Sequence, residues 1–381
     1  MRTNSCNFFP KFNPESATNK HSSMLDPVLS AYGFDNSTCQ VIPHGSGLIN
    51  RTWFIRCQQG NFILQQINSE VFSDPTLIAD NIHQISTYLA DHYPDVLFPR
   101  PISSRDGKNL IRLAPDKYFR LYPFIENSVT IDVVDNHAQA YEAARKFGEF
   151  TRLLSGFPAD RLHQTLPGFH DLSRRYKDFR LALDNGNPHR IQKASHLIAW
   201  LESQNQIVRQ YEAICADPGF RLRVTHHDTK ISNVLFDQNG KGLCVIDLDT
   251  VMPGYFISDV GDMFRTYLSP VTEEESQISR IKVREVFFEA IVRGYLSEMN
   301  EVLTPIEKET FTYAGEFMLY MQALRFLTDY LNDDVYYGSR YEGHNYIRAR
   351  NQITLLQHYQ DQSTQLKSIV SSVLASFLVK S

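Results

Sequence analysis

Residues 226–233 read His-His-Asp-Thr-Lys-Ile-Ser-Asn, and residues 247–249 read Asp-Leu-Asp. The segment between them, 234–246, consists of two short apolar runs joined by a turn that contains Asn-Gly. Asn-Gly between apolar runs is a strong hairpin signal, because both residues tolerate the backbone of a tight turn. A hairpin returns the chain on itself, so Asn233 and Asp247 are expected to lie close together.

The residue types around this hairpin match what phosphoryl transfer needs. That reaction requires in-line positioning, neutralisation of developing charge, and a carboxylate directed at the attacking hydroxyl. Asp228 is the candidate for orienting the acceptor hydroxyl and taking its proton, and Lys230 for reaching the phosphoryl group. Asn233 and Asp247 offer hard oxygen ligands, for which Mg²⁺ is the expected metal. The alternative, that these are only turn and cap residues, does not account for their joint spacing.

The spacing Asp-x-Lys-x-x-Asn, followed by an Asp after a hairpin, resembles the catalytic and metal-binding loops of protein-kinase-like enzymes. The glycine of their Asp-Phe-Gly motif is absent, and residues 247–249 are more similar to the aminoglycoside phosphotransferase and choline kinase branch. Within that branch the chain resembles the N-acetylhexosamine 1-kinases, over about residues 25–366. The segments that carry this resemblance are 226–237, 245–254, 325–332 and 344–350.

The resemblance implies an α+β, bilobal protein-kinase-like fold, with a small antiparallel sheet lobe containing one main helix and a larger, mostly helical lobe. It implies an ATP- and Mg²⁺-dependent kinase acting on the anomeric hydroxyl of an N-acetylhexosamine. The expected partner is then a small amino sugar facing Asp228, with Asp249 and Arg325 as further candidate contacts. Two alternatives stay open: a kinase of another small alcohol (aminoglycoside, choline, homoserine or fructosamine), and a nucleotide-binding pseudokinase.

The nucleotide-binding lobe is expected over residues 24–124, after a flexible leader at 1–23. Asp74, followed by proline, predicts the start of a helix that runs to His92. Runs of β-branched and aromatic residues predict strands at 52–57, 61–67, 110–113 and 118–122.

Candidates for nucleotide binding come from this lobe. The Gly45-Ser46-Gly47 segment precedes the first hairpin and is a candidate for covering phosphates, although a lone Gly-x-Gly is also a plain turn. The segment around Tyr122 is expected to form an interlobe hinge whose backbone pairs with adenine. Gln65 stands where many kinases carry a phosphate-binding lysine. The expected nucleotide-binding residues are Gly45, Ser46, Gly47, Asn50, Thr52, Gln65, Tyr122 and Phe124.

Residues 125–381 change to long helical periods and are expected to form the second lobe. Asp259 and Asp262 are expected to cap a helix, with support of the catalytic loop as the alternative. His226 is expected to be buried and structural, and His227 to be exposed. The expected helices are 138–154, 172–182, 191–216, 283–299, 306–331, and 346–377 with breaks.

Composition narrows the class of protein further. The 381 residues are 42% hydrophobic and 21% charged, which is typical of a globular protein. The formal net charge of -5 and the absence of a long basic run argue against nucleic acid as a partner. Five cysteines without CxxC spacing argue against a disulfide framework and a zinc site, and indicate a reducing cytoplasm. No apolar run approaches the roughly 20 residues that cross a membrane, so no membrane association is expected. None of these patterns predicts an oligomeric state.

Overall fold

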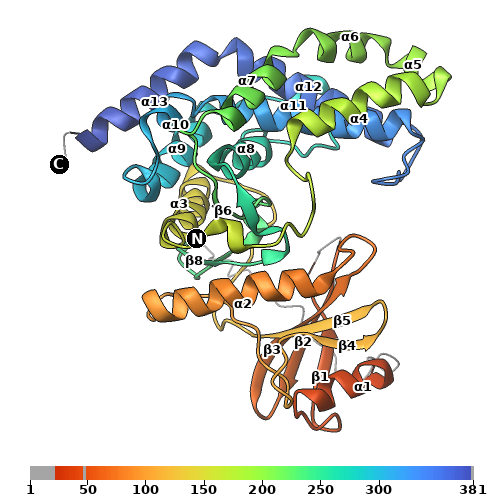
Figure 1. Cartoon of the computed structure of the whole chain (residues 1–381), viewed down its shortest axis with the longest axis vertical. Helices are drawn as coiled ribbons and strands as arrows, with labels where there is room; N and C mark the ends of the chain where they lie inside the picture. The colour runs from red at the N-terminus through yellow and green to blue at the C-terminus, as the bar shows by residue number, and fades with distance from the viewer. Residues whose placement is uncertain (1–21, 46–48, 379–381) are drawn as a thin grey trace, which may run out of the picture. The chain divides into compact units, whose positions relative to one another are not determined.

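The computed structural model describes residues 22–45 and 49–378 (Figure 1). An antiparallel sheet and helices make up separate parts of it, so the predicted α+β class is confirmed. The predicted leader, residues 1–23, lies outside the described residues except for Ser22 and Ser23, which begin helix α1 (Ser22–Ala31). Among the helices of the described ranges, none is both long enough and apolar enough to span a membrane.

Helix α2 (Pro75–His92) is held by polar contacts that its sequence pattern does not reveal. The Asn81 side chain donates to the backbone oxygens of His163 at 2.9 Å and Val251 at 3.1 Å. The helix therefore groups with later parts of the chain, whereas the sequence predicts it within the lobe of residues 24–124. Two compact units result: the described residues up to Ser73 with Pro101–Phe124, and Asp74–Arg100 with the described residues from Ile125 onward.

The first unit is a five-stranded antiparallel sheet in the order β1-β2-β3-β5-β4. Side chains alternate between the two faces of a strand, and one face packs with α1 into an apolar core. The core residues are Leu25, Val28, Leu29, Ile55, Leu64, Phe119 and Leu121. The strands are β1 (Gln40–Pro43), β2 (Arg51–Cys57), β3 (Gly60–Asn68), β4 (Ile111–Ala114) and β5 (Lys117–Pro123), so the four predicted strands are confirmed within one or two residues.

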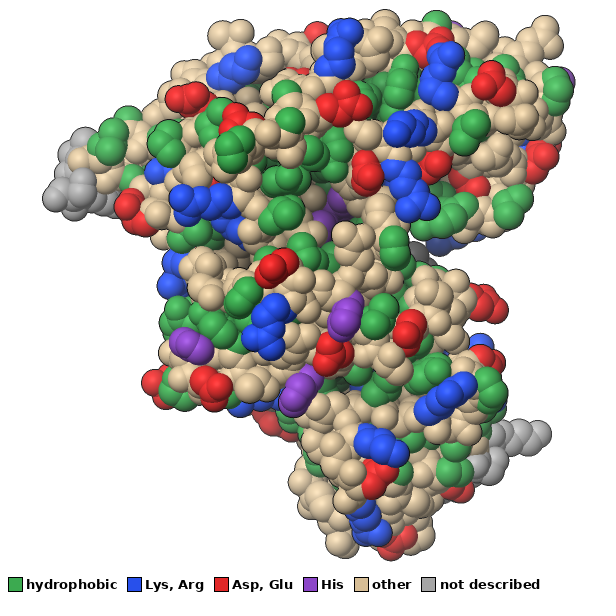
Figure 2. Space-filling model, viewed as in Figure 1, with side chains coloured by type: hydrophobic (Ala, Val, Ile, Leu, Met, Phe, Trp, Pro, Cys, Tyr) green, Lys and Arg blue, Asp and Glu red, His purple; other side chains and the backbone are tan. Residues whose placement is uncertain are grey.

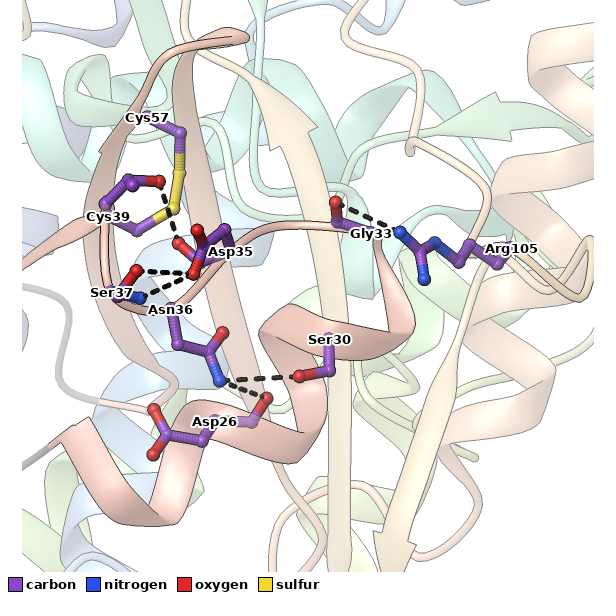
Figure 3. Close-up of a disulfide and its surroundings, with 10 residues drawn as sticks. Asp26, Ser30, Gly33, Asp35, Asn36, Ser37, Cys39, Cys57 and Arg105 are labelled. Atoms are coloured by element: carbon purple, nitrogen blue, oxygen red, sulfur yellow. Dashed lines mark hydrogen bonds between the residues drawn. A yellow bond between two sulfur atoms is a disulfide. The ribbon is translucent and has the colours of Figure 1, made fainter.

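Cys39 and Cys57 form a disulfide between neighbouring strands of this sheet (Figure 3). Gln40 pairs with Arg56, so residues 39 and 57 face each other one position further along, with a Cα–Cα distance of 4.5 Å. Figure 3 shows the preceding turn, where the Asp35 carboxylate accepts hydrogen bonds from Ser37.

The cysteine prediction therefore needs correction, because strand register creates a pair that cysteine spacing does not report. Disulfides persist mainly in oxidising compartments, so the cysteines no longer support a cytoplasmic location, which stays a prediction. Cys215 and Cys244 are free thiols, and Cys6 lies outside the described residues.

Reduction of the Cys39–Cys57 disulfide is expected to lower the free energy of unfolding by about 3 kcal/mol, because the cross-link closes a loop between residues 18 apart in sequence and restricts the unfolded chain. Thermal unfolding with and without a phosphine reductant measures the effect. The Cys39→Ser/Cys57→Ser double variant is the control and should not respond. Identical wild-type transitions in both conditions would contradict the prediction.

The second unit is built around two close helix pairings, seen in Figure 1. Helix α3 (His137–Leu153) packs on α9 (Glu285–Met299), and Gly294 permits the contact, since a Cβ there would lie 2.3 Å from the Tyr141 carbonyl oxygen. Helix α11 (Tyr313–Leu331) is buried around most of its circumference and packs against α4, α8 and α12. A helix that is apolar on all sides belongs in a protein interior.

The remaining elements show where the helix predictions were too long. The predicted helix 191–216 is three helices, α5 to α7, because the helical hydrogen-bond ladder breaks at Ala194 and again near Gln204. The predicted helix 306–331 is divided into α10 and α11. The elements are η1 (Ala159–Arg161), α4 (Leu172–Asn185), α5 (Pro188–Lys193), α6 (Ser195–Ser203), α7 (Gln206–Ala216), β6 (Arg223–Thr225), η2 (Ile231–Asn233), β7 (Val234–Phe236), β8 (Gly242–Val245), η3 (Leu248–Thr250), β9 (Met252–Gly254), α8 (Phe256–Tyr267), η4 (Ile278–Arg280), α10 (Pro305–Glu309), α12 (His344–Asp361) and α13 (Ser363–Leu378).

Candidate active site

The predicted hairpin is present and brings two polar segments to its open end. Strands β7 and β8 pair antiparallel, with Val234 opposite Val245. The pairing continues one step beyond the strands, because the Ile246 amide donates to the Asn233 carbonyl oxygen at 2.8 Å. Asp247, the next residue, therefore lies beside the end of the loop that carries Asn233.

Three of the predicted residues contact one another directly. The Asn233 amide nitrogen donates to the Asp228 backbone oxygen at 2.8 Å and to Asp228 Oδ2 at 3.0 Å. Lys230 Nζ lies 3.2 Å from the same carboxylate oxygen. The Asp228 carboxylate raises the pKa of Lys230, and Asp262 and Asp247 add to this effect, so the ammonium stays protonated. Asp228, Lys230 and Asn233 thus form one cluster whose field includes Asp247.

Asp247 and Asp249 occupy different environments although one residue separates them. Asp247 adopts a left-handed backbone conformation with φ 60° at the start of η3. Asp249 is buried inside η3, with 2% of its surface exposed, and its backbone oxygen accepts from Thr165 Oγ1 at 2.7 Å. The left-handed conformation at Asp247 changes the direction of the chain between strand β8 and η3.

The donor set at the hairpin end fits a hard cation that shares its coordination with another ligand. Both side-chain hydrogen bonds that Asn233 makes to described residues use its amide nitrogen, which leaves the amide oxygen for a metal that Asp247 would share. In the described ranges, no group of three or more His, Cys, Asp or Glu side chains forms a metal cage. Mg²⁺ typically binds through one or two protein groups plus waters and substrate phosphates, so this pair suits a nucleotide-bound metal.

Two carboxylates from helix α8 hold the backbone of the loop that contains Asp228. Asp259 accepts from the amides of His226 at 3.0 Å and His227 at 2.7 Å. Asp262 accepts from the Thr229 amide at 2.8 Å. Burial raises the pKa of Asp259 to about 7, and its two amide hydrogen bonds oppose that shift. The loop amides have no strand or helix partner, so these carboxylates satisfy them.

The prediction that Asp259 and Asp262 cap a helix was wrong, and the alternative, support of the catalytic loop, is confirmed. Helix α8 begins at Phe256, and Tyr255 stands at its cap without a side-chain hydrogen bond. The two aspartates lie within the helix. Sequence could not separate these roles, because the amides that the carboxylates bind are about 33 residues away.

The Asp259→Asn substitution is expected to destabilise the chain by about 2–4 kcal/mol, because the amide group turns an NH₂ toward one of two buried backbone donors. Amide exchange at residues 226–229 should become faster, as measured by hydrogen–deuterium exchange. Asp184→Asn changes an exposed aspartate on α4 and serves as the matched control. Unchanged protection of those amides in Asp259→Asn would show that the loop is held in another way.

The two histidines before Asp228 are both buried. His226, whose Nε2 lies 2.9 Å from the Ile246 carbonyl oxygen, has the predicted structural role. The prediction that His227 is exposed was wrong: it is 5% exposed, and burial lowers its pKa to about 4. His227 Nδ1 lies 3.2 Å from Nδ1 of His170, a residue that no local pattern singled out.

The predicted nucleotide-binding residues of the sheet share one face of it. Register places Thr52 opposite Gln65 and Gln65 opposite Arg120, and this row lies on the face away from the α1 core. Tyr122, two residues beyond Arg120, projects from the same face, as strand alternation requires. The structure therefore groups Thr52, Gln65 and Tyr122, which were predicted separately.

The other predicted nucleotide-binding residues do not share one face of the sheet. Gly45 has φ +80°, a conformation that favours glycine, whereas Ser46 and Gly47 lie outside the described residues. Asn50 Oδ1 accepts from the Asn68 amide at 3.0 Å and so fastens the start of β2 to the end of β3. Phe124 packs edge-on against Phe54 at 5.0 Å between ring centres.

A guanidinium group occupies the space next to Gln65 where a kinase lysine would project. Gln65 Oε1 accepts from Arg120 Nε at 3.0 Å and Nη2 at 2.9 Å, and Arg120 is 2% exposed. The amide at position 65 thus serves as the acceptor for a buried cation. Asp80 on helix α2 lies 2.8 Å from His163.

The Gln65→Lys substitution, which installs the usual kinase residue, is expected to destabilise the chain by about 2–4 kcal/mol, because it places an ammonium against the buried Arg120 and removes two hydrogen bonds. Gln65→Glu keeps an acceptor and should retain the wild-type stability. Chemical denaturation of the three proteins measures the difference. A Gln65→Lys variant as stable as Gln65→Glu would contradict the assigned contact.

The α+β architecture and the cluster of Asp228, Lys230 and Asn233 beside Asp247 agree with the kinase-like fold that the sequence predicts. Residues 40–301 match the phosphotransferase enzyme family. The match spans more than half of the chain, and the chain belongs to this family.

Solved structures share the fold at low sequence identity. An amicoumacin kinase in complex with AMP-PNP, Ca²⁺ and Ami has a TM-score of 0.59 at 15% identity, over 89% of this chain and 94% of that one. A microcompartment-associated aminopropanol kinase has a TM-score of 0.59 at 17% identity, over 91% and 98%. A choline kinase from Cryptosporidium parvum Iowa II has a TM-score of 0.56 at 15% identity, over 93% and 99%.

Proposed function

We propose that the chain is an ATP- and Mg²⁺-dependent kinase that transfers the γ-phosphoryl group of ATP to the anomeric hydroxyl of an N-acetylhexosamine. The observation that carries the kinase assignment is the contact cluster of Asp228, Lys230 and Asn233 beside Asp247. The similarity of the same segments to N-acetylhexosamine 1-kinases supports the acceptor. Membership of the phosphotransferase family supports the reaction type.

Each member of the cluster has one role in this proposal. Asp228 Oδ2 is occupied by Asn233 and Lys230, which leaves Oδ1 to accept the hydroxyl proton as the sugar oxygen attacks. Lys230 is protonated and half exposed, so it is suited to neutralise charge on the transferring group. The Asn233 amide oxygen and the Asp247 carboxylate would hold Mg²⁺, which neutralises phosphate charge when bound.

The proposed nucleotide grip relies on the sheet face that carries Thr52, Gln65 and Tyr122. Gln65 accepts hydrogen bonds from Arg120 and is not a lysine. The absence of a lysine at this position favours the pseudokinase alternative. The intact Asp-Lys-Asn-Asp cluster favours catalysis instead. Lys230, and a metal held by Asn233 and Asp247 when bound, would supply the positive charge that the reaction needs.

The proposed sugar contacts are Asp228, Asp249 and Arg325. Arg325 lines a cavity of about 430 Å³, and its guanidinium can donate to a carbonyl oxygen such as that of an acetamido group. A second guanidinium, that of Arg175, lines the same cavity. Asp178 and Asp329 line the cavity too, but no hydrogen bond joins either of them to these two guanidinium groups among the described residues, so the donors favour an acylated amino sugar, whose nitrogen carries no charge, over a cationic acceptor such as choline.

A screen of acceptors tests the proposal. Purified protein with ATP and Mg²⁺ should release ADP with N-acetylglucosamine or N-acetylgalactosamine, and ³¹P NMR of the product should place the phosphate on the anomeric oxygen. Glucosamine, choline and kanamycin are the matched comparisons, because each carries a free cationic group. Turnover of choline or kanamycin, with no activity on any N-acetylhexosamine, would contradict the proposed acceptor. The kinase assignment would still stand.

Variants of the cluster test the reaction itself. Asp228→Asn should lower kcat by about 10²–10⁴-fold with little change in folding, because it removes the general base. Asp247→Asn should raise the Mg²⁺ concentration needed for half-maximal rate, because it removes a metal ligand. The exposed Asp184→Asn variant is the control for both. Full activity in Asp228→Asn would contradict the proposed role of Asp228 as general base.

A further inference from the structure

The cavity of about 430 Å³ lies in the second unit beside helices α4 and α11 and contains two guanidinium groups. Its wall also includes carboxylates and two tyrosines from the segment that follows α11. The residues that matter for its chemistry are Arg175, Asp178, Arg325, Asp329, Tyr336 and Tyr337.

Arg325 is oriented by aromatic rings and leaves most of its donors unused. Its guanidinium carbon lies 5.0 Å from the ring centre of Phe169 and 5.4 Å from that of Tyr337. Its Nη1 donates to Gln322 Oε1 at 3.0 Å. In the described part of the chain no carboxylate pairs with Arg325. Stacking on rings fixes the plane of a guanidinium without consuming its hydrogen bonds.

Arg175 is the second cation and is incompletely satisfied. Its Nη2 donates to the Phe169 carbonyl oxygen at 3.3 Å, and its Nε is buried with no hydrogen-bond partner among the described residues. Burial lowers the pKa of Arg175, and the charge of Arg325 lowers it further. A pair of neighbouring cations with an unused buried donor is costly unless an anion joins them.

In the described part of the chain, neither carboxylate of the wall hydrogen-bonds to Arg175 or Arg325. Asp178 Oδ2 lies 3.6 Å from Arg175 Nη1, longer than a hydrogen bond, and the Asp178 side chain is 41% exposed. Asp329 accepts from the amides of Tyr336 and Tyr337, so its carboxylate stabilises the loop that follows α11. Burial raises the pKa of Asp329, and its hydrogen bonds from the amides of Tyr336 and Tyr337 oppose that shift.

We propose that this cavity binds an oxyanion group, a carboxylate or a phosphate, between Arg175 and Arg325. Planar guanidinium groups bind such groups through paired, charge-assisted hydrogen bonds. Acidic and basic side chains are interspersed over the face drawn in Figure 2, so on that face no large field of one sign attracts anions.

A chain of side-chain contacts links Arg325 in the cavity wall to the loop that carries Asp228, and it begins at the Phe169 ring. The Phe169 ring stacks on His170 with ring centres 4.4 Å apart, and His170 Nδ1 lies 3.2 Å from His227 Nδ1. His227 directly precedes Asp228. The oxyanion is thus either a substituent of the acceptor or a separate anion bound beside the catalytic loop. The first of these rests on the proposed function, whereas the second does not.

Titration with inorganic phosphate tests the cavity directly. Isothermal calorimetry is run on the full chain with ADP and Mg²⁺ present, so that any nucleotide phosphate site is filled. Arg175→Gln and Arg325→Gln should each weaken phosphate binding by about tenfold or more, because each removes a charge-assisted contact. Lys177→Gln removes an exposed cation two residues from Arg175 on the same helix and should bind as the wild type does.

A charge-conserving variant and thermal unfolding are the two controls for the phosphate titration. Arg175→Lys keeps the charge and loses the paired donors, so it should bind phosphate with intermediate affinity and a wild-type Tm. Thermal unfolding of every variant shows whether lost binding reflects lost folding. Equal phosphate affinity in Arg175→Gln and Lys177→Gln, or no binding to the wild type, would overturn the proposal.

Acceptor kinetics then distinguish the two sources of the anion. A higher kcat/KM for N-acetylglucosamine 6-phosphate than for N-acetylglucosamine, with the advantage lost in Arg175→Gln, identifies an acceptor substituent. Phosphate binding without such a preference identifies a separate anion. If no hexosamine is phosphorylated, the proposed function fails, while the phosphate titration still decides the cavity.

Discussion

The site depends on the hydrogen bonds that helix α8 makes to the loop before η2. Strand β6 ends at Thr225, and the loop amides beyond it have no ladder to join, while His227 adopts φ 65°. Asp259 accepts hydrogen bonds from two of these amides, and the Tyr267 hydroxyl donates to the Thr229 carbonyl oxygen at 2.5 Å. Buried backbone groups must be paired, so α8 fixes the loop conformation. The position of Asp228 follows from that conformation.

The hairpin and the four residues around it were predictable because their signals are local. Asn-Gly between apolar runs specifies the turn, and the spacing of Asp228 and Asn233 lies within one loop. Contacts between distant segments were not predictable. Asp259 acts on amides about 33 residues away, and the Cys39–Cys57 bond follows from a register that cysteine spacing does not encode. Helix ends within 191–216 were missed because the apolar period continues through the breaks.

The pairing of Gln65 with Arg120 illustrates the same limit with a chemical consequence. The sequence shows a missing lysine, and only the β3–β5 register shows that a cation stands opposite the amide, 55 residues away. That cation is buried and engaged within the sheet, so it does not simply replace the lysine. In the proposed reaction the neutralisation of phosphate charge therefore falls on Lys230 and the metal held by Asn233 and Asp247.

Repulsion contributes to specificity as much as attraction does. Arg325 contacts the rings of Phe169 and Tyr337, and Arg175 lines the same cavity with a buried donor that has no partner among the described residues. A cationic amine entering this space would meet two like charges, opposed by the partly exposed Asp178 and by Asp329, whose carboxylate already accepts from the amides of Tyr336 and Tyr337. A neutral or anionic group would instead complete hydrogen bonds that the protein leaves open. Because α11 is buried around most of its circumference, it fixes the backbone that carries Arg325, and under the proposal the cavity discriminates by the charge of its occupant.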